Sequence, residues 1–216
     1  MNAREEILGR IGEIVPTRPA AEVAASYGRI DRNYLRRHHD GSAAAGVLDL
    51  FAERVADYRA TVLRVSPSGV PAAIAERLSA RPGTYGVPGD LPAEWLAATR
   101  PVAGTGVPLV RDPEIASLDG LAGAVTGCAA AIAETGTVVL DHGAAQGPRA
   151  LSLVPDYHLI VVLADQVEPD VPEALERLDP HRPLTLVSGP SATSDIELSR
   201  VEGVHGPRTL EVLVVS

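Results

Sequence analysis

Short apolar runs closed by Gly, Pro or Asp alternate along the chain with stretches whose apolar residues recur at helical spacing. A short apolar run that ends in a turn signal predicts a strand. The continuous run 157–163 is typical of a strand in the middle of a parallel sheet. The predicted strands are residues 61–65, 84–87, 107–110, 157–163, 184–187 and 210–215.

Helices are predicted between these runs, where apolar positions line one face and charged residues the other. Strands that alternate with helices and short loops predict an α/β fold with a mostly parallel sheet flanked by helices. The predicted helices cover 2–15, 42–58 and 70–78, and further helix starts are expected at Asp90, at Asp112 followed by Pro113, and at Asp170.

The longest apolar region is Ala124–Leu140, which Gly136 divides. Two strands that meet in a hairpin turn at 134–137 account for it best. A helix across 124–132 remains the alternative, because periodicity alone does not separate the two for a short apolar run.

Two parts of the chain differ in pattern. Residues 42–216 form the predicted α/β domain, whereas 1–41 form a helix and an arm that packs on the domain or on a second subunit. The arm holds a basic patch, Arg29–Arg37. This patch is either a solvated linker or a docking surface for an acidic partner or ligand.

Composition excludes several function classes. The net charge of −9 argues against nucleic acid and anionic membranes as partners, because both require clustered cations. No apolar run approaches the ~20 residues of a membrane helix, and the N-terminus does not resemble a signal peptide, so we expect a cytoplasmic protein. The single cysteine, Cys128, cannot form an internal disulfide or by itself hold an iron–sulfur cluster.

Candidate chemistry concentrates in residues 184–208. The apolar run 184–187 stops at Ser188-Gly189-Pro190, and more hydroxyl residues follow. Ser194 and Glu197 match a capping box, so the pattern predicts a buried strand, a hydroxyl-lined loop and a helix start. Such an arrangement can bind an anion, although a capped turn without a ligand has the same pattern.

Several side chains near this loop could contact an anionic ligand. Asp195 faces either the ligand or the helix N-terminus. His205 with Arg208, and His142 with Arg149, suit a carboxylate, which Arg can bind with two hydrogen bonds. Because ligands of open α/β sheets lie beyond the carboxyl ends of strands, we expect three loops to converge there. The predicted ligand-binding residues are Thr135, Gly136, Thr137, His142, Arg149, Ser188, Gly189, Ser191, Thr193, Asp195, His205 and Arg208.

Glu134 is the candidate catalytic residue. It is a carboxylate inside an apolar run, so it is either buried with partners or placed at a strand end that faces a cleft. Partial desolvation would raise its pKa and suit it to act as a base or nucleophile. The alternative is that Glu134 accepts backbone N–H groups and only stabilises the turn.

Other common sites lack a sequence pattern. The six histidines have no metal-ligand spacing, so no metal site is predicted. No G-x-S-x-G and no G-x-G-x-x-G motif is present, so neither a serine hydrolase elbow nor a dinucleotide fingerprint is expected.

Four segments together resemble the LUD-domain family, and within it the lactate utilization protein C type. The resemblance covers essentially all 216 residues. It implies a fold similar to that of sugar-phosphate isomerases and CoA-transferases. The segments are Asn2–Leu8 (NAREEIL), Ile132–Leu140 (IAETGTVVL), Ser188–Glu197 (SGPSATSDIE) and Gly203–Arg208 (GVHGPR).

The resemblance also implies a function. Such a protein is expected to be a subunit of a bacterial L-lactate utilization system that oxidises lactate to pyruvate with two iron–sulfur partner proteins. The clusters are expected in those partners, with no cofactor in this chain, and self-association is left open. Two alternatives remain: a stand-alone enzyme of the CoA-transferase or phosphosugar-isomerase type with Glu134 catalytic, and a purely structural interaction subunit.

Overall fold

The computed structural model describes residues 2–15, 18–35, 44–100, 106–190, 192–193, 201–202 and 206–216. The chain divides into two compact units, Met1–Leu35 and Arg36–Ser216. Each unit is described by itself.

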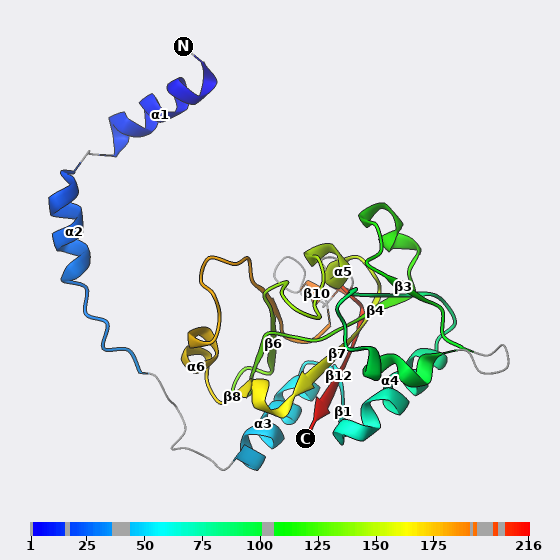
Figure 1. Ribbon diagram of the computed structural model, residues 1–216. Coiled ribbons are helices and arrows are strands. Elements are labelled where there is room, and N and C mark those ends of the chain that lie inside the picture. Colours follow the sequence, from blue (N-terminus) through cyan, green and yellow to red (C-terminus); the bar gives the residue numbers. More distant parts are fainter. Residues whose placement is uncertain are drawn as a thin grey trace. The chain divides into compact units, whose positions relative to one another are not determined.

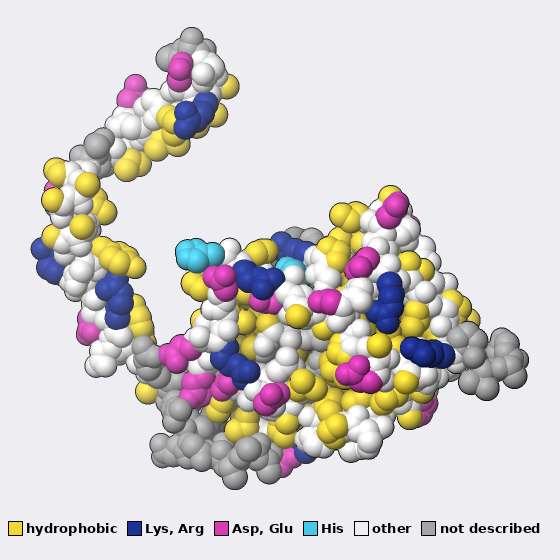
Figure 2. Space-filling view, viewed as in Figure 1, with side chains coloured by type: hydrophobic (Ala, Val, Ile, Leu, Met, Phe, Trp, Pro, Cys, Tyr) yellow, Lys and Arg dark blue, Asp and Glu magenta, His cyan; other side chains and the backbone are white. Residues whose placement is uncertain are grey.

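The first unit contains two helices, α1 (Ala3–Ile14) and α2 (Ala20–Gly28). Asn2 and Glu5 form a reciprocal capping box that begins α1, as expected for an Asn before a helix with Glu at its third position. The sequence pattern predicted α1 but not α2. Neither helix has a buried residue, so the described part of this unit has no core of its own, and hydrophobic side chains lie on its surface (Figure 2). Its exposed large apolar side chains are Ile7, Leu8, Ile11, Ile14, Val15, Val23, Tyr27, Ile30, Tyr34 and Leu35.

The second unit is built around a six-stranded sheet in the order β1-β12-β7-β4-β2-β3 (Figure 1). All of its strand pairs are parallel, which confirms the predicted α/β fold with a mostly parallel sheet. The strands are β1 (Thr61–Val65), β2 (Tyr85–Val87), β3 (Leu109–Arg111), β4 (Gly123–Thr126), β7 (Tyr157–Leu163) and β12 (Thr209–Val215).

A second sheet of four strands has the order β8-β5-β6-β9. Its strands β5 and β6 form an antiparallel hairpin whose turn contains Gly136, so the hairpin interpretation of Ala124–Leu140 is confirmed and the helix alternative is wrong. The same region also supplies β4 to the larger sheet, so it holds three strands rather than two. The strands are β5 (Ala130–Ile132), β6 (Thr137–Leu140), β8 (Val167–Glu168) and β9 (Thr185–Val187).

The remaining elements are short, apart from two helices that the apolar spacing predicted. These are α3 (Ala44–Asp57) and α4 (Val70–Ser79). Two further strands, β10 (Ala192–Thr193) and β11 (Val201–Glu202), pair with each other in antiparallel fashion. The other helices are α5 (Arg149–Leu153), α6 (Val171–Glu176), η1 (Pro67–Gly69), η2 (Ala93–Thr99), η3 (Ile115–Gly120) and η4 (Ala164–Gln166).

Two predicted helix starts are wrong, because the two aspartates accept hydrogen bonds from distant backbone N–H groups instead of capping a helix. Asp112 has a φ of 46° and its Oδ1 accepts a hydrogen bond from the Gly89 N–H at 2.6 Å. Asp90 accepts from the Ala145 N–H at 2.9 Å. Helices η3 and η2 therefore begin later, after Glu114 and Pro92. The start of α6 after Asp170 is confirmed.

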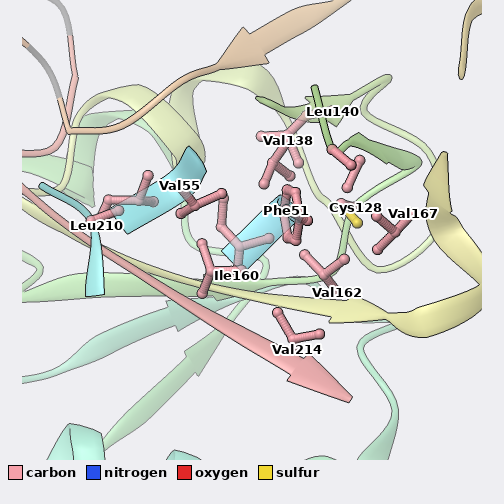
Figure 3. Close-up of a cluster of buried hydrophobic side chains, with 14 of the residues drawn as sticks. Phe51, Val55, Cys128, Val138, Leu140, Ile160, Val162, Val167, Leu210 and Val214 are labelled. Carbon is pink, nitrogen blue, oxygen red and sulfur yellow. The ribbon is translucent and has the colours of Figure 1, made fainter. Parts of the chain in front are cut away.

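Two aliphatic cores cover the faces of the larger sheet. One lies between this sheet, α3 and the smaller sheet, and includes Phe51, Ile160 and Val214 (Figure 3). The other packs α4 and η2 on the opposite face, around Ile74 and Leu213. Side chains alternate between the two cores along β7 and β12, as the pleat of a strand requires. None of the described helices is long and apolar enough to span a membrane.

The different burial of Phe51 and Ile11 predicts very different losses of stability when each side chain is truncated to alanine. Phe51→Ala should lower the free energy of unfolding by about 3–5 kcal/mol, because the side chain is fully buried and leaves a cavity. The matched change Ile11→Ala, on an exposed face of α1, should lower it by less than about 0.5 kcal/mol. Urea unfolding of the full chain measures both. Equal costs would contradict the assignment of the core to the second unit.

Candidate functional site

Hydroxyl side chains join the hairpin turn to the end of β9. Thr135 Oγ1 and Thr137 Oγ1 lie 2.7 Å apart, and Thr137 Oγ1 lies 2.7 Å from Ser188 Oγ. The contact follows from the antiparallel register of β6 and β9, in which Val138 pairs with Val187. Two of the predicted segments, 134–137 and 188–190, are thus brought together.

Glycine is required on both sides of this contact. Gly136 and Gly189 have φ values of 58° and 83°, which disfavour residues with a Cβ atom. A Cβ at Gly136 would lie 2.7 Å from the Arg54 carbonyl carbon, and one at Gly189 would lie 2.6 Å from Tyr58 Cβ. Arg54, near the end of α3, and Tyr58, directly after it, therefore pack closely against the two predicted loops.

A cleft of about 340 Å³ lies beside β9. It unites Ser188–Pro190 with Gly206–Pro207, which come from the two most specific segments of the sequence pattern. Ser152, Thr185 and Ser188 contribute its hydroxyl residues. The described lining consists of Ser152, Leu153, Thr185, Leu186, Val187, Ser188, Gly189, Pro190, Gly206 and Pro207.

The cleft corrects two expectations about position. Its segments Ser152–Leu153 and Gly206–Pro207 precede β7 and β12, so it lies toward the amino ends of these strands and not beyond their carboxyl ends. Strand β9 belongs to the smaller sheet, where it occupies an edge. Leu186 is 56% exposed, so the prediction of a buried strand at 184–187 is wrong at its centre.

His142 is held at the opposite end of the β6–β9 pair. Its Nε2 lies 2.9 Å from Thr185 Oγ1, and its backbone has a φ of 57°. Burial lowers the pKa of His142, an effect that the Gly147 carbonyl partly opposes and that Arg149 reinforces. A neutral imidazole is therefore favoured. Because Thr185 also lines the cleft, His142 contacts one residue of its wall, whereas Arg149 is exposed and is not among the described lining residues.

Arg208 forms an ion pair at the surface. Its Nε donates to Asp156 Oδ1 at 2.6 Å, and both side chains are more than half exposed. Arg208 directly follows the cleft residue Pro207, so it lies near the cleft. Its positive charge is partly offset by Asp156.

Glu134 lies in the turn between β5 and β6 and is half-buried. Its N–H donates to the Pro169 carbonyl at 3.0 Å, on the β8 side of the sheet. The described residues that line the cleft do not include Glu134. Its catalytic role therefore stays a prediction.

Three predicted ligand-binding residues, Ser191, Asp195 and His205, lie outside the described residues, as does the helix start expected at Ser194. Thr193 lies in β10, where it pairs with Val201. The structure therefore brings together Thr135, Gly136, Thr137, Ser188 and Gly189, with His142 and Arg149 as a second group.

Sequence reasoning missed the polar network around His142. Asp141 Oδ1 accepts from the Gly143 N–H and the Gln146 side chain, and Asp141 Oδ2 pairs with Arg182 at 3.2 Å. Gln146 Oε1 in turn accepts from the N–H groups of Asp141 and His142. The available signal was polar residues in a Gly-rich loop directly after an apolar strand.

Two buried polar groups in the central strands were also missed. His158 is 1% exposed and its Nε2 lies 2.8 Å from Thr126 Oγ1, whereas Glu211 is 1% exposed and paired with arginines. A charged or imidazole side chain inside a continuous apolar strand was the signal that could have revealed them. Among the described residues, no group of three or more His, Cys, Asp or Glu side chains is placed to hold a metal ion.

Comparison with known proteins identifies the family. The LUD domain model matches residues 116–215. Lactate utilization protein C of Deinococcus radiodurans is 48% identical over 175 residues, which cover 79% of this chain and 80% of that protein. The chain belongs to the LUD-domain family. The cleft lining lies entirely within the matched part of this LUD-domain chain.

Two further relatives agree with this assignment. Lactate utilization protein C of Halalkalibacterium halodurans is 34% identical over 84 residues, 35% of this LUD-domain chain and 36% of that protein. The crystal structure of a DUF162 family protein from Deinococcus radiodurans is similar with a TM-score of 0.65 and 41% identity. That match covers 81% of this chain and 99% of the other.

The buried imidazole predicts a pH dependence of stability. Burial lowers the pKa of His158 to about 3, below its ordinary value of 6.5, so protonation favours the unfolded chain. Its contribution to stability is therefore fully present above about pH 6.5 and is lost as the pH falls toward 3. The slope from this group is at most about 1.4 kcal/mol per pH unit.

His158→Gln, which cannot titrate, should flatten the pH dependence between pH 6.5 and 4 compared with the wild type. Guanidinium unfolding at a series of pH values measures the slope, and the difference between the two proteins cancels the contribution of Glu211. Identical slopes would show that His158 titrates normally in the folded protein.

Proposed function

We propose that this chain is a subunit of a cytoplasmic L-lactate utilization system, and that its cleft binds a small carboxylate. The observation that supports the binding role is the meeting of Ser188–Pro190 with Gly206–Pro207 at one cleft. These segments are separated by residues 191–205 and carry the family pattern. A wall that carries hydroxyl groups suits the oxygen atoms of a carboxylate.

The names of the relatives support the role in lactate utilization. Two of them are called lactate utilization protein C. In the proposed system lactate is oxidised to pyruvate together with two partner proteins that hold the iron–sulfur clusters. The single Cys128 is buried and its pKa is raised to about 12 by burial, which makes it a poor thiolate ligand. The proposed role of this chain is to bind the carboxylate while electrons pass through the partners.

An enzyme with a catalytic Glu134 is the competing function. It receives less support, because Glu134 lies on the β8 side of the hairpin turn and the described cleft is lined from β9. A structural subunit without a ligand is the third possibility, which a binding measurement separates from the other two.

A charge placed on the cleft wall tests the binding role. Leu186→Asp should weaken binding of L-lactate and pyruvate by about tenfold or more, because the new carboxylate repels the ligand at the cleft. The exposure of Leu186 allows the change without loss of the core. Leu186→Asn is the matched control of equal size and should bind within about threefold of the wild type. Calorimetry on the purified chain measures both.

The same variants test the biological role. A bacterial host that lacks its own copy should grow on L-lactate with the wild type and Leu186→Asn, and poorly with Leu186→Asp. Normal growth with Leu186→Asp, together with no binding by the wild type, would favour the structural subunit.

Glu134→Gln separates a binding subunit from an enzyme. As a binding subunit, the variant should support growth on L-lactate at the wild-type rate, because the cleft is lined by other residues. A catalytic base or nucleophile would instead lose about a hundredfold or more in rate. Loss of growth with unchanged thermal stability would therefore overturn the proposed role in favour of the enzyme.

A further inference from the structure

A second cavity of about 440 Å³ lies on the other face of the sheet, between the end of α4, η2 and the segment before β3. Arg81 is the single charged residue in its described lining. The rest of the lining is apolar side chain, hydroxyl and backbone, from Leu78, Ser79, Pro82, Gly83, Ala98, Thr99, Gly106, Val107 and Pro108. Neither the sequence pattern nor the family assigns a role to it.

Behind Arg81 lies the buried carboxylate of Glu211. Arg77 binds it with two parallel hydrogen bonds, Nε to Oε2 at 2.7 Å and Nη2 to Oε1 at 2.8 Å. Tyr157 donates a third hydrogen bond to Oε2 at 3.1 Å. Burial opposes ionisation, yet these contacts lower the pKa of Glu211, so the carboxylate is charged and the positive charge of Arg77 offsets it.

Arg81 is a second cation beside a carboxylate that is already neutralised. Its Nη2 lies 3.2 Å from Glu211 Oε1, and its guanidinium stacks 4.5 Å above the Tyr157 ring. The described residues provide no further ion pair for it, and its side chain is 36% exposed at the cavity. Arg77, Arg81 and Glu211 together carry one excess positive charge, and the Arg81 side chain is the more exposed of the two arginines, 36% against 26%.

The helix end beside the cavity does not cancel this charge. The carbonyls at the end of α4 would repel an anion. The Tyr85 hydroxyl lies 3.1 Å from Leu78 O and 2.9 Å from Arg81 O, so its hydrogen partly offsets the negative charge of these carbonyls.

We propose that this cavity is a binding site for an organic carboxylate with an apolar body. The carboxylate would pair with the Arg81 guanidinium, whose planar geometry it matches. The apolar body would contact Val107 and Pro108. The site is separate from the cleft beside β9, because the two share no lining residue.

Hexanoate is a suitable probe, since it combines a carboxylate with an apolar chain. Calorimetry with the full chain should show saturable binding of hexanoate that Arg81→Gln weakens at least about tenfold, the loss expected for a charge-assisted hydrogen bond. Arg81→Lys, which keeps the charge, should retain more of the affinity than Arg81→Gln. Arg77 still neutralises Glu211 in both variants.

Two controls keep the test decisive. Ala98→Phe narrows the cavity from η2 without touching the ion pairs, and should also weaken hexanoate binding. Leu186→Asp should leave it unchanged, so failure here and failure of the cleft beside β9 are distinguishable. Absence of saturable binding, binding that survives both Arg81→Gln and Ala98→Phe, or tighter binding of inorganic phosphate than of hexanoate would each overturn the proposal.

Discussion

The burial of β12 between β1 and β7 is the constraint on which the rest of this structure depends. Residues 210–215 are all buried, and both edges of the strand are paired in parallel. Its register places Thr209 beside Tyr157, and this alignment brings the segments before the two strands to the same end of the sheet. The cleft beside β9 exists because Gly206–Pro207 and Ser152–Leu153 meet there.

A buried charge makes this register hard to change. Shifting β12 by one residue would exchange its two faces and carry Glu211 from the α4 side into the aliphatic core around Phe51. An unpaired carboxylate there would cost several kcal/mol, which exceeds the preference of any single Val or Leu for one face. The ion pair with Arg77 thus selects one alignment of the central strands.

Apolar patterning predicted five of the six strands of the larger sheet closely and did not separate β4, because a continuous apolar run such as Tyr157–Leu163 is buried on both faces, whereas β4 shares one long apolar region with β5 and β6. It did less well where a side chain binds a distant partner. Asp112 looks like a helix cap in sequence, yet it accepts a hydrogen bond from Gly89, which no local pattern reveals. The second sheet could not be predicted from local patterns either, since the pairing of β6 with β9 joins segments separated by more than forty residues.

The candidate site was predictable only where local sequence patterns place its residues, and not where strand pairing does. The meeting of Thr137 with Ser188 was anticipated from loops that follow apolar runs, whereas the involvement of Thr185 with His142 depends on strand register. The position of the cleft at the amino ends of β7 and β12 depends on where β9 of the smaller sheet meets the segments before these strands, which no local pattern reveals. Glu211 was overlooked because its arginine partners lie in α4 and just after it, much earlier in the chain.

The place of β12 also governs how the chain folds as it is made. Strand β1 has β12 as its one neighbour in the larger sheet, so it cannot pair there until β12, much later in the chain, has been synthesised. At typical elongation rates this delay is on the order of ten seconds. The strands β7, β4, β2 and β3 can pair with one another earlier, so the sheet is completed when β12 joins β1 to β7.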